Sequence, residues 1–300
     1  MIFLGFLDNL IHGISLGSIY AIIALGYSMV YGIAKMLNFA HGDVIMVGAY
    51  ISYYAVSSVT GCFGLHPALG LLLSVSICTL LGVTIEFLAY RPLRKAPSLA
   101  VLITAIGISY FLQNAAQLIC GSSTKFFPYV EFFHNKLFTV GELSVSLTTI
   151  VTIAACIVIM IGLTLFTGKT KTGKAMRACA EDKGAAQLMG INVNKTISIT
   201  FAIGSALAAI AGILFGCAYP SLSPTLGSMP GIKAFTAAVF GGIGSIPGAL
   251  LGGILLGIIE NLAKGYISTE LSDAIVFAVL IIVLLVKPTG LLGKKIHEKV

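Results

Sequence analysis

Residues 143–166 read LSVSLTTIVTIAACIVIMIGLTLF and carry no charged side chain. A helix needs about 20 mostly apolar residues to cross the hydrocarbon core of a bilayer, so this stretch predicts a membrane-spanning helix. Similar runs recur, and the predicted spans are 10–33, 42–59, 68–90, 99–119, 143–166, 197–217, 231–245, 247–264 and 272–287. The pattern predicts an all-α integral membrane protein, a polytopic bundle of 8–9 transmembrane helices. The count stays open because the two runs between 231 and 264 are short and glycine-rich.

The composition supports one membrane domain over residues 1–300. Of the 300 residues, 57% are hydrophobic and only 10% are charged, whereas ordinary soluble domains carry about 25% charged residues. No basic residue precedes the first apolar run, and no small-residue cleavage site follows it. We therefore expect the first helix to be retained rather than removed as a signal peptide.

The net charge of +7 is interpreted as membrane topology rather than as a nucleic-acid surface, because cytoplasmic loops collect Lys and Arg. We expect a multi-pass protein with its amino terminus outside and its carboxyl terminus inside. In that orientation the outer segments hold only Lys125, Lys136 and Lys264, and Lys233 lies near the start of a span. The inner segments then hold Lys35, Arg91, Arg94, Lys95, Lys169, Lys171, Lys174, Arg177, Lys183, Lys195, Lys287, Lys294, Lys295 and Lys299.

The sequence offers no metal site and no catalytic constellation. The six cysteines form no CxxC or CxxxC pair, and no His lies at metal-ligand spacing from one of them. Cys78, Cys156 and Cys217 lie in apolar runs, where thiols usually serve as small packing residues. Paired carboxylates and Ser/His dyads are missing from the predicted spans. We therefore expect a protein that is not an enzyme.

Small residues recur at helical spacing in several spans. Examples are Gly13, Gly17 and Ala21, the series Gly204, Ala208, Gly212 and Gly216, and the pairs Gly248/Gly252 and Gly253/Gly257. Small residues allow helix backbones to approach closely in lipid, where the hydrophobic effect does not drive helices together. The spacing predicts tight helix packing and says nothing about substrate.

One polar, basic segment, 167–196, is predicted to face the cytoplasm. Within it we expect a short helix near 182–189, with Asp182 as its N-cap and Gly190 as its left-handed stop. Ala185, Leu188 and Met189 share one face of that helix by their spacing. The helix could dock on a partner, or it could lie against the membrane interface.

The same segment contains a near match to a nucleotide-binding loop. Residues 168–175 read GKTKTGKA, but the last position of a P-loop needs a hydroxyl to hold magnesium, and Ala175 has none. The stretch also leaves a membrane span instead of joining a strand to a helix. We interpret it as a flexible basic loop and expect no cofactor on this chain; if ATP drives the protein, another chain hydrolyses it.

Two places combine polar or helix-breaking residues with apolar surroundings. Asn38-Phe-Ala-His41-Gly-Asp43 lies between the first two spans, and it is either an element of a transport pathway or gate or a cytoplasmic turn with Asp43 capping the next helix. Residues 240–248 read FGGIGSIPG and do not allow an unbroken helix. Such backbone survives at membrane depth only where protein or a water-filled cavity surrounds it. The two glycine-rich broken or re-entrant elements, one in each half, suggest an inverted repeat.

Polar residues inside spans are costly and often functional. Glu86, Lys233 and Glu260 are lone charges in or near spans, and pairing across the bundle is as good an explanation as contact with substrate. Gln113, Asn114 and Gln117 form a stripe that favours hydrogen bonding between helices. The candidate pathway residues are Asn38, His41, Asp43, Lys233, Gly241, Gly242, Gly244 and Glu260.

Taken together, seven segments resemble the permease subunits of branched-chain amino acid ATP-binding-cassette importers over nearly the whole chain. Related permeases carry urea and short amides, so those solutes remain an alternative substrate class. The segments are Gly17–Gly26, Leu37–Asp43, Met46–Tyr50, Arg177–Asp182, Leu188–Ile191, Gly241–Ser245 and Lys287–Leu291.

The resemblance implies a single transmembrane permease domain in the bacterial cytoplasmic (inner) membrane, with a coupling loop at 167–196. It implies a second homologous permease subunit in a heterodimer, two cytoplasmic ATPase subunits that use ATP, and an extracytoplasmic amino-acid-binding protein. The ATPase-coupling residues would be Ala180, Glu181, Asp182, Gly184, Leu188, Gly190 and Ile191, although Cys179-Ala180-Glu181 departs from the EAA pattern of many importers.

A secondary transporter is the rival from another class. It would need a coupling ion, and His41 and Asp43 are the only clustered candidates for proton coupling in the sequence. A secondary carrier would not need a docking loop for an ATPase.

Overall fold

The computed structural model describes residues 2–57, 62–127, 136–140 and 143–293. Six helices in these ranges are long and apolar enough to cross a membrane: α1 (Ile2–Ala34), α3 (Pro67–Ile85, extended by the π-helix Glu86–Tyr90), α4 (Ser98–Cys120), α6 (Leu147–Lys169), α9 (Val193–Ala218) and α11 (Ile246–Tyr266). Shorter helices are α2 (His41–Val56), the 3-10 helix Pro92–Lys95, α7 (Lys171–Glu181), α8 (Lys183–Leu188), α10 (Ser228–Gly241) and α12 (Ser272–Val286). The predicted integral membrane fold is confirmed at this level, and the count of eight or nine spans stays a prediction.

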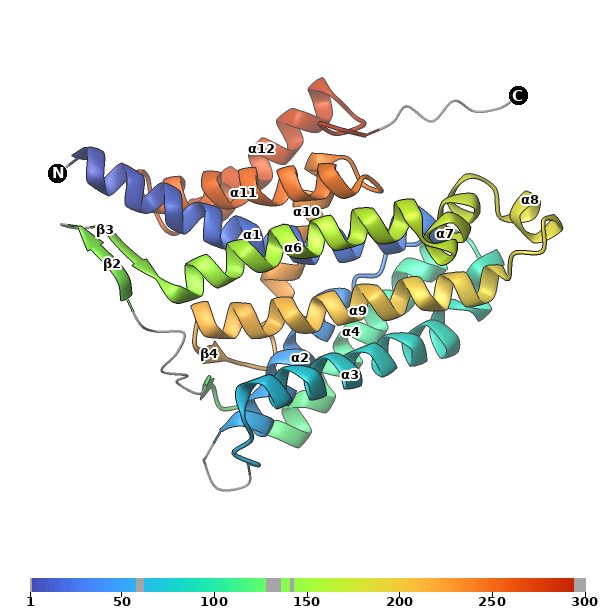
Figure 1. Ribbon diagram of the computed structural model, residues 1–300, viewed down its shortest axis with the longest axis horizontal. Helices are drawn as coiled ribbons and strands as arrows, with labels where there is room; N and C mark the ends of the chain where they lie inside the picture. The colour runs from blue at the N-terminus through green and yellow to red at the C-terminus, as the bar shows by residue number, and fades with distance from the viewer. Residues whose placement is uncertain (1, 58–61, 128–135, 141–142, 294–300) are drawn as a thin grey trace.

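The long helices lie side by side along the long axis of the molecule (Figure 1). The amino terminus and the hairpin of β2 (Lys136–Val140) and β3 (Leu143–Ser146) lie at one end, and α7 and α8 lie at the other. A second small sheet pairs β1 (Lys125–Phe126) with β4 (Ser221–Leu222). Helix α1 is at the centre, where it contacts α6, α9, α10 and α11.

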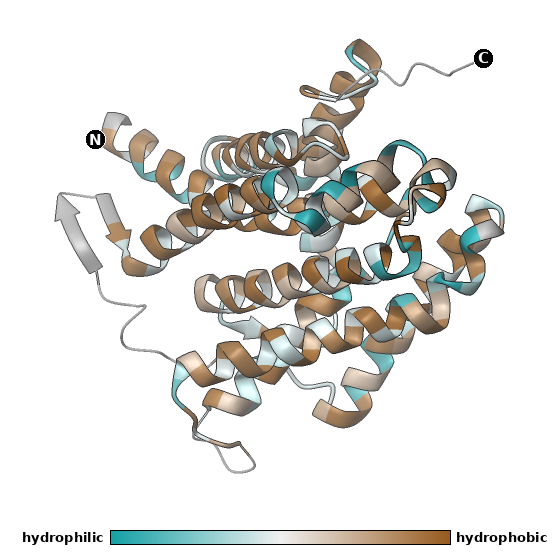
Figure 2. Ribbon diagram, turned by 45° about the vertical axis from the view of Figure 1, so that its right-hand side comes forward, coloured by the Kyte–Doolittle hydropathy of each residue, from teal (hydrophilic) through white to brown (hydrophobic). Residues whose placement is uncertain are grey.

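Apolar residues predominate along the long helices (Figure 2). A helix that is hydrophobic all round is either buried in a core or surrounded by lipid. Residues 19–25 of α1 are all buried, whereas Leu118 and Ile119 of α4 are among the most exposed side chains. The outer helices therefore present apolar surface to a membrane or to partner subunits.

Helices α1 and α11 pack through their small residues, as the spacing predicts. A Cβ atom at Gly257 would lie 2.2 Å from the Gly17 Cα, and one at Gly253 would lie 2.4 Å from the Ala21 Cα. A Cβ atom at Gly13 would lie 2.9 Å from the Ile258 Cα. The two backbones thus touch directly along several turns, a geometry that leaves no room for larger side chains.

Helices α10 and α11 are separate, and the chain turns between them. Gly242 and Gly244 adopt φ values of 106° and 91°, which favour glycine, and Ser245 caps α11 by accepting a hydrogen bond from the Gly248 amide at 3.3 Å. The chain after α12 covers this turn, because the Leu291 and Leu292 amides donate to the carbonyls at the end of α10. Whether the unit re-enters the membrane, and whether the two halves form an inverted repeat, stay predictions.

The interpretation of residues 168–175 as a flexible loop was wrong, because most of the segment belongs to α7. Thr170 caps this helix by accepting a hydrogen bond from the Gly173 amide at 2.9 Å. Gly173 lies against the backbone of α6 at Phe166, and Met176 and Cys179 are buried on the same face. Tertiary packing of one face thus stabilises a helix whose Gly, Thr and Lys content gives little local signal.

The buried cysteines agree with their interpretation as packing residues, since Cys78, Cys156 and Cys217 are all buried and free. Helices α7 and α8, whose sequences carry several Lys and Arg residues, lie at the end opposite the amino terminus (Figure 1). Lys294, Lys295 and Lys299 lie outside the described residues. The orientation across the membrane stays a prediction.

The α1–α11 contact predicts that Gly257→Ala lowers the thermal unfolding temperature of the purified protein. The added methyl group has to push two backbones apart, and overpacking of this kind costs about 1–3 kcal/mol. Gly162→Ala on α6 is the matched control, because nothing lies within 4 Å of its Cβ position and Ala is the better helix former. Equal unfolding temperatures for the two variants would contradict the close contact.

Candidate functional site

The chain returns into the bundle between α1 and α2. His41, the first residue of α2, lies against Gly26, where a Cβ atom would come 2.5 Å from the His41 Nε2 atom. Gly26 precedes the end of α1 at Ala34 by about two helical turns. Helix α2 therefore begins beside α1 about two turns before the carboxyl end of that helix, and His41 is buried there.

The start of α10 meets the start of α2. A Cβ atom at Gly227 would lie 1.8 Å from the Gly42 carbonyl oxygen, and one at Gly42 would lie 2.6 Å from the Gly227 carbonyl oxygen. A Cβ atom at Gly231 would lie 2.8 Å from the Gly42 Cα. Only glycine allows this approach, so the two helix starts touch backbone to backbone.

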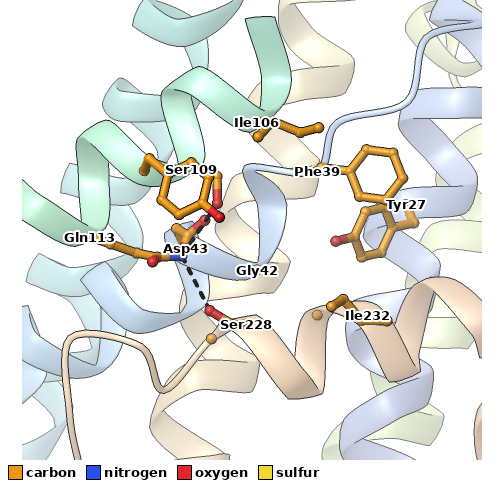
Figure 3. Close-up of a pocket in the computed structure, with 12 residues that line it drawn as sticks. Tyr27, Phe39, Gly42, Asp43, Ile106, Ser109, Gln113, Ser228 and Ile232 are labelled. Atoms are coloured by element: carbon orange, nitrogen blue, oxygen red, sulfur yellow. Dashed lines mark hydrogen bonds between the residues drawn. The ribbon is translucent and has the colours of Figure 1, made fainter. Parts of the chain in front are cut away.

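A cavity of about 240 Å³ lies at this meeting point (Figure 3). It is smaller than the roughly 300–1,000 Å³ typical of sites for drug-sized ligands, so it suits a smaller solute. Side chains from α1, α2, α4 and α10 converge on it. The lining residues are Tyr27, Phe39, Gly42, Asp43, Ile106, Ser109, Tyr110, Gln113, Gly227, Ser228, Gly231 and Ile232.

Asp43 is the charged residue of this cavity, and it is only 1% exposed. Gln113 Nε2 donates to Asp43 Oδ1 at 2.9 Å and also lies 3.2 Å from the Ser228 Oγ and 3.3 Å from the Ser109 Oγ. Figure 3 shows the side chains of Gln113, Ser109 and Ser228 gathered around Asp43. Gln113 therefore joins α2, α4 and α10, as expected for hydrogen bonding between helices.

The surroundings of Asp43 compensate its charge only in part. Its carboxylate forms no ion pair within the described part of the chain. The first-turn position in α2 is worth about 0.3–2 kcal/mol to a carboxylate, whereas desolvating an ion costs several kcal/mol. Neutral hydrogen bonds and the helix dipole are thus weaker than a cation would be at this position.

Phe39 and Gly42 line the cavity together with Asp43, whereas Asn38 and His41 border it without lining it. Tyr90 donates its hydroxyl proton to Asn38 Oδ1 at 2.9 Å, which fixes the segment to the end of α3. His41 lies edge-on to the Tyr27 ring, with centroids 4.6 Å apart. Its Nε2 atom is buried and has no hydrogen-bond partner among the described residues. Within this segment, Asn38 and His41 make contacts to neighbouring helices, and Asp43 is the polar side chain that lines the cavity.

Lys233 and Glu260 lie in a second cavity of about 290 Å³. Lys233 Nζ is 2.8 Å from Glu260 Oε1 and 2.6 Å from Asp273 Oδ1, and Lys264 Nζ is 2.6 Å from Glu260 Oε1. Two cations and two carboxylates balance one another. The geometry thus favours the pairing interpretation of Lys233 and Glu260. Glu86 likewise pairs with Arg94, eight residues further along the chain, and accepts a hydrogen bond from Ser198 of α9.

Gly241, Gly242 and Gly244 lie away from the first cavity. A Cβ atom at Gly241 would lie 1.9 Å from the Gly248 carbonyl oxygen, and Gly244 lies beside Gly32 near the end of α1. These glycines allow close packing at the α10–α11 turn. The structure therefore does not bring them together with Asp43.

The predicted short helix in 167–196 is present as α8. Asp182 Oδ1 accepts hydrogen bonds from the Gly184 and Ala185 amides at 2.7 and 3.0 Å, and Gly190 ends the turn with φ 81°. Both predicted capping residues are thus confirmed. Leu188 and Met189 are 91% and 83% exposed, so this end of α8 projects an apolar tip from the molecule (Figure 1).

Helix α8 is also attached to the bundle through Lys183. Its Nζ donates to the Ala34 carbonyl oxygen at 2.7 Å, one of the last carbonyls of α1, which lack partners within the helix. Burial, together with the positive charges of Arg94 and Lys35, lowers the pKa of Lys183. One side chain therefore links the predicted coupling segment to the helix that leads into the 38–43 segment.

Sequence reasoning missed Tyr27, Ser109 and Ser228 as cavity residues. Each is an ordinary packing or capping residue when it is considered on its own element. Gln113 gave the only signal, as an amide within an apolar span, but its partners Asp43 and Ser228 are 70 and 115 residues away in the chain.

Residues 9–284 match a family described as the permease component of the branched-chain amino acid transport system. The chain is 47% identical to the high-affinity branched-chain amino acid transport system permease protein LivH of Escherichia coli, over 99% of each chain. It is 45% identical to the corresponding protein BraD of Pseudomonas aeruginosa, over 98% of each. A probable LivH of Methanocaldococcus jannaschii is 29% identical over 75% of this chain and 71% of its own length.

The charge of Asp43 predicts how a thiol placed in the first cavity reacts. In a Ser228→Cys variant that also carries Cys62→Ser and Cys120→Ser, a cationic methanethiosulfonate should react at least about threefold faster than an anionic one, because opposite charges attract. Adding Asp43→Asn should abolish this preference.

Ser223→Cys in the charge-balanced second cavity is the matched control and should show little preference. Reaction rates are followed by mass spectrometry of the labelled protein. Equal rates for both reagents at Ser228→Cys would contradict a negatively charged cavity.

Proposed function

This chain belongs to the family of permease components of branched-chain amino acid transport systems, and on that premise we propose that it is a membrane-spanning subunit of an ATP-binding-cassette importer for branched-chain amino acids. The observation that carries the proposal is the match over essentially the full length to permeases of that name. The chain acts as a transport subunit rather than an enzyme, and a separate ATPase subunit supplies the energy.

The exposed tip of α8 supports docking of an ATPase subunit. Leu188 and Met189 are apolar and make an isolated patch at the end of a capped helix. Adjacent exposed apolar residues that project from a protein are candidates for an interaction surface. Two ATPase subunits would dock at this end, one on each permease. Of the proposed coupling residues, Asp182 and Gly190 define the two ends of α8, and Leu188 makes the contact with the ATPase. The others lie on either side of this contact in the sequence: Ala180, Glu181, Gly184 and Ile191.

A chain of contacts connects this tip with the first cavity. Lys183 holds the end of α1 at Ala34. The residues that follow Ala34 form the segment that returns into the bundle and leads to α2. Phe39 in this segment lies against Phe235 of α10, with ring centroids 5.3 Å apart. We assign this aromatic contact to the closure of the cavity toward the α8 end. Movement of α8 during ATP hydrolysis would shift Phe39 and open the cavity.

The exposed face of α4 supports pairing with a second permease subunit. Ile106 and Tyr110 line the cavity and are 42% and 63% exposed, and Ile103 and Phe111 extend the apolar surface. The cavity is therefore completed by whatever covers α4. A homologous permease in a heterodimer would place the pathway between the two subunits, with an extracytoplasmic binding protein at the end that carries the β2–β3 hairpin. The basic residues near α7 and α8 support a cytoplasmic position for the α7–α8 end, because cytoplasmic loops collect Lys and Arg.

A secondary transporter is the rival mechanism. Of its two candidate residues for proton coupling, the cavity contains one rather than both. Asp43 lines the cavity, whereas His41 lies against Gly26 and Tyr27. Uptake of radiolabelled leucine by cells that express the importer should continue in the presence of a proton ionophore and should stop when ATP is depleted. The opposite pattern would favour proton coupling. Competition by urea or acetamide, but not by valine, would favour the alternative substrate class.

The docking proposal predicts that Leu188→Glu reduces co-purification of the ATPase subunit at least about tenfold. A buried charge without a partner is costly in an interface. Gln187→Glu adds the same charge at the neighbouring exposed position and should co-purify normally. The yield of the ATPase on affinity-tagged permease measures both. Normal capture by Leu188→Glu would contradict docking through the α8 tip.

The transmission proposal predicts a different effect for Lys183→Met. This variant keeps the exposed tip but loses the contact with Ala34, so it should bind the ATPase normally while leucine transported per ATP hydrolysed falls at least about fivefold. Lys174→Met removes an exposed cation from α7 and serves as the control. The ratio is measured in proteoliposomes. An unchanged ratio for Lys183→Met would show that the contact transmits nothing.

A further inference from the structure

The first cavity contains a buried carboxylate for which the described part of the chain provides no cation. Asp43 is 1% exposed and forms no ion pair among the described residues, although other buried carboxylates of the bundle do. Glu86 has Arg94, and Glu260 has Lys233 and Lys264. Buried charges in proteins are normally paired. Asp43 is therefore the exception, and it is located at a cavity rather than in a packed core.

The remaining lining restricts what the missing partner can be. Gln113 donates to Asp43, and its amide is shared with the hydroxyls of Ser109 and Ser228. The other side chains of the lining are aromatic or aliphatic: Tyr27, Phe39, Ile106, Tyr110 and Ile232. A strongly hydrated metal ion would need several oxygen ligands. In the described ranges, no three His, Cys, Asp or Glu side chains lie close enough together to hold a metal ion. One carboxylate in an apolar lining suits an organic ammonium group with an apolar substituent.

We propose that Asp43, positioned by Gln113 between the starts of α2 and α10, binds the ammonium group of the transported amino acid, while the apolar lining receives its side chain. The inference rests on the proposed function, since it assigns the substrate contact of that transport pathway. Asp43 would then contribute to selection by the permease itself, after the binding protein has released its substrate.

The closing experiment separates the charge of Asp43 from its structural hydrogen bond. Asn at position 43 retains an oxygen that accepts from Gln113, whereas Glu retains the charge. Leucine uptake is measured in proteoliposomes that contain the whole transporter. Asp43→Asn should lower the rate at least tenfold, and Asp43→Glu should retain more activity than Asp43→Asn. Glu270→Gln, at an exposed turn, is the matched control and should transport normally. Asp43→Asn with more than half of the wild-type rate would overturn the proposal.

A binding measurement makes the result independent of transport. A carbodiimide modifies carboxyl groups, and its product at Asp43 is quantified by peptide mass spectrometry in the assembled transporter. Leucine and 3-methylbutylamine should each reduce the N-acylurea product at Asp43 at least fivefold, and any amide that a bound amine forms with the activated Asp43, with release of the urea, is counted with the protected fraction; 4-methylpentanoate, which lacks the ammonium group, should have neither effect. Equal protection by all three compounds, or by none, would overturn the assignment.

The two readouts fail in different ways. If the wild-type transporter shows no ATP-driven leucine uptake but the amine still protects Asp43, the proposed function fails and the ammonium site stands. If uptake is normal and unaffected by Asp43→Asn, the importer stands and the site fails.

Discussion

The helical backbone is interrupted before α2 and before α10, and the two helix starts meet inside the bundle, where Gly42 and Gly227 are both buried. Backbone that leaves a helix at membrane depth carries polar groups that lipid does not satisfy, so other protein segments have to surround it. Each interruption supplies that surrounding for the other, because a side chain at either glycine would collide with the carbonyl oxygen of its partner. The start of α2 and the start of α10 are therefore held together, and the cavity with Asp43 forms where they meet.

The rest of the structure supports this contact. Helix α1 runs through the centre and is fixed to α11 by glycines on both helices, which leaves its opposite side to carry Gly26 and Tyr27 against α2. At the end near α8, Lys183 holds the last turn of α1, and Asn38 is held by Tyr90. Both ends of the 35–40 segment are thus tied to other elements. These contacts form the route by which we propose that a displacement of α8 reaches the cavity.

Local and periodic features were predictable from the sequence, and features made by distant residues were not. The spacing of Gly253 and Gly257 predicted close helix contact, and Asp182 and Gly190 predicted the ends of α8, because these signals act within a few residues. Helix α7 was missed because its stability comes from packing of Gly173 on α6. Asp43 was identified as a candidate, but its partners Gln113 and Ser228 could not be assigned from spacing alone. Lys233 and Glu260 were equally plausible pathway residues in sequence, and only the ion pairs with Asp273 and Lys264 distinguish them.

The contact between the two helix starts is tested most directly by leucine uptake of the assembled transporter with Gly227→Ala, compared with Gly107→Ala on α4, where nothing lies within 4 Å of the Cβ position. Both variants add one methyl group and should still bind the ATPase subunit, because α8 is untouched. The predicted result is loss of uptake with Gly227→Ala alone, since the added methyl group separates α2 from α10 and deforms the cavity. Normal uptake by Gly227→Ala would contradict the account, because the pathway would then not depend on the meeting of these two helices.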